Sequence, residues 1–193
     1  LDLYSQNLAL RTELFPGIEP VLDELERLGL PWGVVTNKPG WLTDPLLALL
    51  GLDRRASCVV SGDTVAERKP HPLPLLHAAE LVGVAPAHCV YVGDAERDIQ
   101  AGRAAGMTTV VAAYGYISAD EDPAAWQPTG IVAEPGELLE WVGAAAAREI
   151  RAYEALDITG GHTPVIALTA HVAGTDAETW RNAGMDAYMT KPF

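Results

Sequence analysis

The sequence predicts an α/β fold with a doubly wound, mostly parallel sheet of the Rossmann-like kind. Two observations carry this prediction. Short Val-rich runs alternate along the chain with longer stretches whose apolar residues recur at helical spacing. Gly, Pro or polar residues separate each run from the next. Strands that alternate with helices favour parallel pairing, with helices covering both faces of the sheet.

The expected elements follow this alternation in order. We predict helices over residues 17–30, 40–52, 71–84, 95–107 and 135–147, with an irregular start around Pro45 in the second of them. We predict strands within residues 32–37, 57–63, 88–94, 108–114 and 130–134. The same order continues with a helix over 148–156, a strand within 163–171, and a helix and a last short strand within 176–193.

Composition limits the class of protein. The 193 residues suffice for one domain, or for one domain and a fragment, and the formal net charge is −13. This charge argues against nucleic acid and anionic membranes as partners. The start of the chain has no signal-peptide pattern, and no apolar run approaches the ~20 residues of a membrane span. Cys58 and Cys89 precede Val-rich runs and are interpreted as buried thiols, so we expect a cytoplasmic protein.

Polar residues follow several of the predicted strands. In a parallel sheet these residues gather at the carboxyl edge, where ligands bind. The residues collected in this way are Thr36, Asn37, Asp63, Lys69, Asp94 and Asp98.

These residue types suit phosphate chemistry. Two carboxylates four residues apart can approach one Mg²⁺ ion, which prefers oxygen ligands. A Thr hydroxyl with the backbone N–H groups after it can hold phosphate oxygens, and a lysine supplies a compact positive charge. Each piece has a plainer alternative: a helix cap with a surface acid, an ordinary turn, or a solvated lysine. Arg54 and Arg55 are interpreted as a solvated loop pair, with a phosphate contact as the alternative.

Three motifs in order resemble the haloacid-dehalogenase-like phosphohydrolases, in their phosphoglycolate phosphatase and N-acetylmuramate 6-phosphate phosphatase branch. "VVTNKP", "ERKPHP" and "YVGDAERDIQAGRAAGM" resemble the second, third and fourth family motifs, and "VVAAYGYI" followed by "EDPAAW" resembles this branch. The resemblance covers about residues 1–142. It implies that Thr36 and Lys69 are catalytic, that Thr36, Asn37 and Lys69 bind phosphate, and that Asp94 and Asp98 belong to the metal site.

One departure from the family pattern bears on activity. The first family motif is a strand ending in DxD, whose first Asp is the nucleophile and whose second is the general acid and base. No strand of this chain ends in that pattern, and most of the helical cap is missing. We therefore expect an N-terminally truncated phosphatase core that is inactive as given and binds Mg²⁺ weakly or not at all.

The last part of the chain resembles a different family. Residues 148–193 resemble the end of a response-regulator receiver domain of the hybrid histidine kinase type. The resemblance implies that Thr169 is the switch hydroxyl and that Lys191 is the lysine that pairs with a phosphorylated Asp, which is itself missing. We expect two parts, a phosphatase core over 1–146 and a receiver-like fragment over 147–193 that completes the same sheet.

Three functions remain open from the sequence. The first is a Mg²⁺-dependent phosphomonoester hydrolase of the phosphoglycolate phosphatase type, acting on a small phosphorylated metabolite. The alternatives are a receiver-type signalling or interaction module, and a recombined or designed chimera without catalytic function. An incomplete sheet also predicts self-association of the chain.

Overall fold

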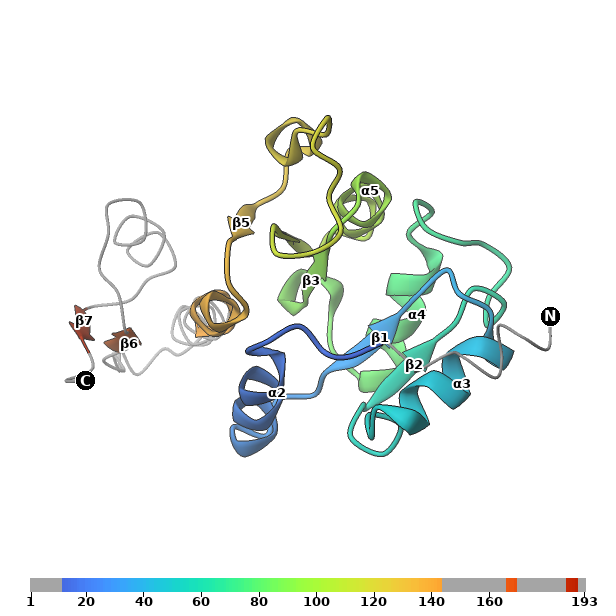
Figure 1. Ribbon diagram of the computed structural model, residues 1–193, viewed down its shortest axis with the longest axis horizontal. Helices are drawn as coiled ribbons and strands as arrows, with labels where there is room; N and C mark the ends of the chain where they lie inside the picture. The colour runs from blue at the N-terminus through green and yellow to red at the C-terminus, as the bar shows by residue number, and fades with distance from the viewer. Residues whose placement is uncertain (1–11, 144–165, 170–186, 191–193) are drawn as a thin grey trace, which may run out of the picture. The chain divides into compact units, whose positions relative to one another are not determined.

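The computed structural model describes residues 12–143 and the backbones of two short strands, residues 166–169 and 187–190. The chain divides into two compact units, Leu1–Gly136 and Glu137–Phe193 (Figure 1). The division of the chain into a core over 1–146 and a fragment over 147–193 stays a prediction.

The first unit contains the predicted alternation of helices and strands, so the α/β class is confirmed. The helices are α2 (Ile18–Arg27), α3 (Gly40–Leu49), α4 (Leu73–Val82) and α5 (Glu96–Ala104), with short 3-10 turns η1 (Pro86–His88), η2 (Pro123–Trp126) and η3 (Pro135–Glu137). The strands are β1 (Gly33–Val35), β2 (Cys58–Val60), β3 (Val90–Gly93), β4 (Thr108–Ala112) and β5 (Gly130–Val132). Residues 138–143 are again helical.

Pro45 corrects the expected start of the second helix. Helix α3 begins regularly at Gly40 and passes through Pro45. A proline inside a helix removes one backbone hydrogen bond, here the one to the carbonyl of Trp41. Trp41 is 53% exposed. Helix α3 nevertheless continues past the proline to Leu49.

Every strand pair of the first unit is parallel, in two separate ladders. Gly33 pairs with Cys58 in the β1–β2 ladder. The other ladder has the order β3-β4-β5, with Val90 beside Thr108 and Val110 beside Gly130. The alternating chain thus forms parallel strands joined by helical crossovers, as predicted, but no ladder joins β1 to β3 among the described residues.

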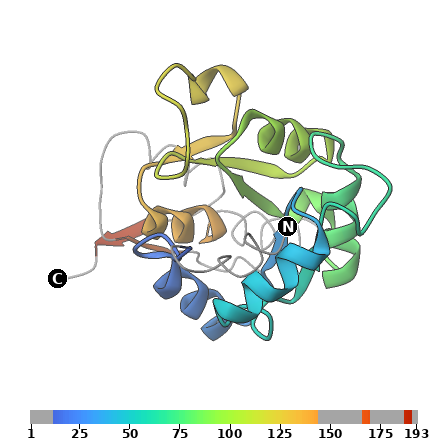
Figure 2. The same cartoon turned by 45° about the vertical axis from the view of Figure 1, so that its right-hand side comes forward.

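Each ladder has its own helical cover, and a buried cluster of Leu75 from α4 with Ala101 and Ala105 from the α5 region joins the two. Helix α4 packs on β1 and β2, where Val60 and Ala78 are buried together with Cys58. Helix α5 packs on β3 and β4, and Ile99 of α5 is buried against Val111 and Trp126 (Figures 1 and 2). The strands β1 and β3, which face the break between the ladders, contain no fully buried residue, whereas β4 is buried in all but its first.

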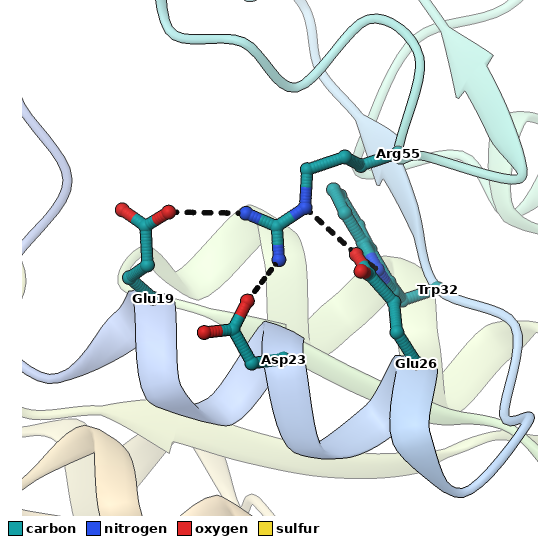
Figure 3. Close-up of polar contacts among 5 residues, drawn as sticks. All are labelled: Glu19, Asp23, Glu26, Trp32 and Arg55. Carbon is teal, nitrogen blue, oxygen red and sulfur yellow. Dashed lines mark hydrogen bonds and ion pairs between the residues drawn. The ribbon is translucent and has the colours of Figure 1, made fainter.

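An arginine joins α2 to the loop that follows α3 (Figure 3). The Arg55 guanidinium lies 3.1 Å from Glu19, 2.6 Å from Asp23 and 2.8 Å from Glu26, all on one face of α2. Glu26 also accepts a hydrogen bond from the Trp32 indole at 3.1 Å. The interpretation of Arg55 as a solvated loop residue was wrong, because its side chain is only 22% exposed and binds three carboxylates.

In the second unit the structure describes the strands β6 (Ile166–Thr169) and β7 (Ala187–Thr190), which pair in parallel. Both strands fall within the ranges that the sequence predicts. Thr169, the predicted switch residue, ends β6 opposite Thr190. Lys191 lies outside the described residues. The receiver-like reading of this unit and its place beside the first sheet stay predictions.

The two cysteines are free thiols, Cys58 buried in β2 and Cys89 half-buried before β3. Burial raises the pKa of both thiols, so neither is a reactive thiolate at neutral pH. Among the helices that the structure describes, none has both the length and the apolar content that a bilayer crossing requires.

Candidate active site

The predicted site residues of the first unit come from turns at the carboxyl ends of β1, β2 and β3. Thr36 and Asn37 directly follow β1, Lys69 lies in the segment before α4, and Asp94 and Asp98 flank the start of α5. Contacts described below join Asn37, Lys69 and Asp98 into one connected group. The carboxyl edge of parallel strands therefore brings together residues that are far apart in the sequence.

Asn37 holds the backbone of Lys69. Its side-chain amide donates to the Lys69 carbonyl oxygen at 2.8 Å, and its side-chain oxygen accepts from the Lys69 N–H at 3.0 Å. This pair of bonds uses the amide group on both sides, so the side chain of Asn37 fixes the lysine. The second N–H of the amide takes no part in these two bonds, so it can still donate to an anionic oxygen.

The ammonium group of Lys69 is surrounded by three oxygens. It donates to the carbonyl oxygen of Val35 and to the hydroxyl of Tyr91, each at 2.8 Å. It also lies 2.8 Å from Oδ1 of Asp98, in an ion pair whose side chains are only 9% and 7% exposed. This ion pair places an ammonium group beside a carboxylate at the carboxyl edge of the sheet, with the two charges balanced.

Asp98 reaches this lysine because of a glycine on the adjacent strand. A Cβ atom at Gly93 would overlap the Cβ and carboxyl atoms of Asp98, so the helix start can come this close only beside a glycine. Oδ1 of Asp98 is buried and, within the described part of the chain, is held by the ion pair but receives no directed hydrogen bond.

Asp94 and Asp63 have structural contacts of their own. Oδ2 of Asp94 accepts from the backbone N–H of Tyr116 at 2.9 Å, which ties the turn after β3 to the loop after β4. Oδ1 of Asp63 accepts from the N–H of Gly40 at 2.8 Å, at the start of α3. Asp63 thus satisfies one of the free donors of a helix N-terminus.

The carboxylates fit Mg²⁺ in kind. Carboxylate oxygens are its preferred ligands, and Asp98 offers a buried oxygen without a directed hydrogen bond. However, Lys69 already neutralises Asp98, and the described residues contain no group of three potential ligands. Asp94 and Asp98 can therefore supply part of a magnesium site.

Thr36 lies in a tight turn next to this group. Its N–H donates to the carbonyl of Val60 at 2.9 Å, and its hydroxyl accepts from the N–H of Lys38 at 3.1 Å. The hydroxyl keeps its own proton for donation to a further oxygen. A hydroxyl at the end of β1, close to a buried ammonium, is a suitable donor for an anionic oxygen.

Tyr91 is a site residue that the sequence analysis missed. Its hydroxyl contacts Lys69 and donates to the carbonyl of Val35 at 3.3 Å. Burial, followed by the negative charges of Asp98 and Asp94, raises the pKa of this phenol well above 10. The signal was available in "YVGD", where a phenol hydroxyl stands inside an otherwise apolar strand two residues before Gly93.

Comparison with known proteins gives consistent matches to one family. The profile of the family described as haloacid dehalogenase-like hydrolase matches residues 1–112. A phosphoglycolate phosphatase of Xanthomonas campestris pv. campestris is 51% identical over 140 residues, covering 72% of this chain and 63% of the relative. An N-acetylmuramic acid 6-phosphate phosphatase of Pseudomonas aeruginosa is 40% identical over 140 residues, covering 72% of this chain and 62% of the relative.

Solved structures give the same result for the fold. The crystal structure of a predicted phosphoglycolate phosphatase from Haemophilus somnus 129PT superposes with a TM-score of 0.67 at 32% identity, over 71% of this chain and 60% of that chain. The chain therefore spans a little over 60% of the length of the curated relatives it matches.

Proposed function

Because the chain belongs to the haloacid dehalogenase-like hydrolase family, we propose that its first unit carries the phosphate-facing part of a phosphomonoester hydrolase site of the phosphoglycolate phosphatase type. The observation that carries this proposal is the buried ammonium of Lys69, held by Asn37, Tyr91 and Asp98 at the carboxyl edge of the sheet. Burying an ammonium group costs free energy, so a buried lysine is expected where its positive charge acts on another group, such as a bound phosphate.

Each residue has a role in binding and orienting the phosphoryl group. The Thr36 hydroxyl and the backbone N–H groups after it donate to the phosphate oxygens. Lys69 neutralises the charge that builds on these oxygens as the ester bond breaks. Asn37 sets the position of Lys69 through two backbone bonds. The likeness of the chain to phosphoglycolate phosphatases at 51% identity favours a small phosphorylated acid as the substrate.

In this proposal, the carboxylate that attacks the phosphoryl group is not one of the described residues. The one D-x-D in the sequence is Asp120–Asp122. Asp120 follows no strand, and Asp122 accepts a hydrogen bond from Ala124 at the start of η2. Neither carboxylate ends a strand of the sheet. We therefore expect the 193 residues alone to hydrolyse phosphoglycolate far more slowly than a version that carries a strand ending in DxD.

Magnesium is the proposed cofactor, with Asp94 and Asp98 as the residues that would hold it. When bound, the ion would neutralise phosphoryl oxygens. Asp98 already shares its charge with Lys69, so Asp94 is the stronger ligand of the two. Calorimetric titration with Mg²⁺ should give dissociation in the millimolar range, which Asp94→Asn weakens more than Asp98→Asn. Micromolar affinity in the unmodified chain would contradict this proposal, because it would require a further ligand.

Phosphate release from phosphoglycolate and from N-acetylmuramic acid 6-phosphate tests the proposed function. Three proteins are compared: the chain itself, the chain extended by a strand ending in DxD, and the extended chain with Lys69→Arg. We expect turnover only in the extended chain, with phosphoglycolate preferred, and its loss in Lys69→Arg because a guanidinium does not fit the oxygens around the ammonium. Robust turnover by the unextended chain would refute the proposal that the attacking carboxylate is absent from the described residues.

The second unit gives a separate test of the receiver-like alternative. We propose that it does not accept phosphate from acetyl phosphate, because the resemblance that includes Thr169 and Lys191 lacks the phospho-accepting Asp. Mass spectrometry after incubation with acetyl phosphate should show no added phosphoryl group. A base-labile adduct on an Asp of residues 148–193 would support a signalling function in place of this proposal.

A further inference from the structure

The three oxygens around the Lys69 ammonium have different chemical characters. Val35 supplies a backbone carbonyl, Asp98 a carboxylate and Tyr91 a phenol hydroxyl, each 2.8 Å from Nζ. An ammonium group has three N–H donors. Two of these donors point to Val35 and Tyr91, whereas the Asp98 oxygen is held by the ion pair without a directed hydrogen bond, so a phosphoryl oxygen that binds the ammonium competes with all three neighbours.

The hydroxyl of Tyr91 differs from the other two oxygens because it is also a donor. It accepts from Lys69 and has a hydrogen-bond contact with the Val35 carbonyl at 3.3 Å. The same carbonyl therefore has two donors, one from the lysine and one from the tyrosine. If the lysine withdraws an N–H from Val35, the phenol still satisfies this carbonyl, and no buried acceptor is left without a partner.

We propose that Tyr91 is a positioning residue, which directs the Lys69 ammonium toward the phosphoryl group and satisfies the Val35 carbonyl when the lysine turns away from it. This inference rests on the proposed phosphatase function. Without the hydroxyl, the ammonium keeps the carboxylate of Asp98 as its strongest partner. It then lies closer to Asp98 and is less available to the substrate.

The contact between Lys69 and Tyr91 is a hydrogen bond to the phenol hydroxyl. Nζ is 5.5 Å from the ring centroid but 2.8 Å from the hydroxyl oxygen, so it lies beyond the hydroxyl and not over the aromatic face. The ring itself packs with the buried cluster of Leu75, Ala101 and Ala105. Substituting Phe for Tyr91 keeps this packing and removes only the hydroxyl.

The phenol can play this part over a wide pH range. Burial and the nearby negative charges of Asp98 and Asp94 raise its pKa well above 10, so it stays protonated at neutral pH. A protonated phenol accepts from the ammonium and donates to the carbonyl at the same time.

Nuclear magnetic resonance of the lysine side chains tests the positioning without any need for activity. The chain has only three lysines, Lys38, Lys69 and Lys191, so ¹⁵N-labelled lysine gives a simple spectrum in which Lys69→Arg assigns the Lys69 signal. We expect a slowly exchanging Lys69 ammonium signal, with a cross-peak from its protons to the Tyr91 ring. The cross-peak needs no variant, and its absence would overturn the proposal.

Two matched variants complete this measurement. Tyr91→Phe should make the Lys69 ammonium exchange faster with solvent and shift its signal. Tyr114→Phe is the control, because Tyr114 is half-buried, meets the Phe15 ring edge to face with 5.5 Å between centroids, and makes no hydrogen bond to Lys69 in the described part of the chain. A Lys69 signal that is the same in Tyr91→Phe and in the unmodified chain would refute the positioning role, whereas a change in both variants would indicate a general effect on folding.

The effect of Tyr91 on catalysis is measured by the kinetics of the chain extended by a strand ending in DxD. One hydrogen bond to a charged group corresponds to a change in rate of about ten- to hundredfold. Tyr91→Phe should lower kcat by about this factor and leave KM within about twofold, because the interaction matters most as charge develops. An unchanged kcat would overturn the proposal. If the extended chain shows no hydrolysis at all, the proposed function fails, and the spectrum of Lys69 still decides the role of Tyr91.

Discussion

Replacing Lys69 by Met should destabilise the first unit strongly, because it leaves the Asp98 carboxylate without its partner. Asp98 is 7% exposed, and its Oδ1 has no other partner in the described part of the chain. Removing one member of a buried ion pair typically costs about 3–5 kcal/mol. Met resembles the apolar stem of the lysine, so most of the expected loss in free energy of unfolding comes from removing the charge.

The reverse substitution should cost less. In Asp98→Asn, the ammonium keeps the Val35 carbonyl and the Tyr91 hydroxyl, each at 2.8 Å. We expect a loss of about 1–3 kcal/mol, which is the range for an incompletely satisfied buried polar group. The double variant Lys69→Met/Asp98→Asn removes both charges together. Its loss in free energy of unfolding should be about 2 kcal/mol smaller than the sum of the losses in the two single variants.

Urea unfolding followed by tryptophan fluorescence measures these three values, since Trp126 is buried in the same unit as the ion pair. Arg68→Met is the matched control, because Arg68 is an exposed neighbour of Lys69 with a single bond to the Gly62 carbonyl. A loss below about 1 kcal/mol in Lys69→Met would mean that the pair is not buried as described. Additive losses in the double variant would mean that the two side chains do not interact.

Three further predictions concern other contacts. Gly93→Ala should lower the thermal midpoint and displace Asp98, because the added Cβ overlaps that side chain, whereas Gly136→Ala, which meets nothing within 4 Å, should have little effect. Arg55→Gln should lower the midpoint at low ionic strength, and the difference should shrink in 1 M salt as screening weakens the three ion pairs. Stability should fall as the pH rises above about 10, where the unfolded phenol of Tyr91 ionises but the folded one does not. Tyr91→Phe should reduce that fall in urea titrations at pH 9 and 11.

The positions of helices and strands were predictable from the sequence because they depend on local periodicity. Each of the five strands of the first unit lies within its expected range, and the four helices from α2 to α5 do so as well. Pro45 was misjudged because a proline usually disrupts a helix, whereas α3 passes through it from Gly40 to Leu49. Arg55 was misjudged because its three partners lie 29 to 36 residues away in the sequence.

The candidate site was predictable as a collection of residues and not as a set of contacts. Thr36, Lys69 and Asp98 each follow a different predicted strand, and parallel pairing of these strands places all three at the carboxyl edge of the sheet. This much can be read from the sequence. The bonds of Asn37 to Lys69 span 32 residues, and their geometry depends on how two turns meet. Asn37, whose role in phosphate binding stays a prediction, also holds the lysine backbone, which no spacing rule indicates.

The break between the two ladders has a consequence for how the first unit assembles. Within each ladder, paired residues are close in sequence: Gly33 and Cys58 are 25 residues apart, and Val90 and Thr108 are 18 apart. The hydroxyl of Tyr91 and the carbonyl of Val35, which join the ladders, are 56 residues apart. Closing a short loop costs less entropy than closing a long one, so each ladder can form with its own helix before the two meet. The bond between Tyr91 and Val35 is then expected among the last to close, whereas Lys69 lies only 22 residues from Tyr91 and can reach its hydroxyl as early as either ladder forms. Hydrogen exchange should accordingly find the amides of β4 protected longer than those beside the site.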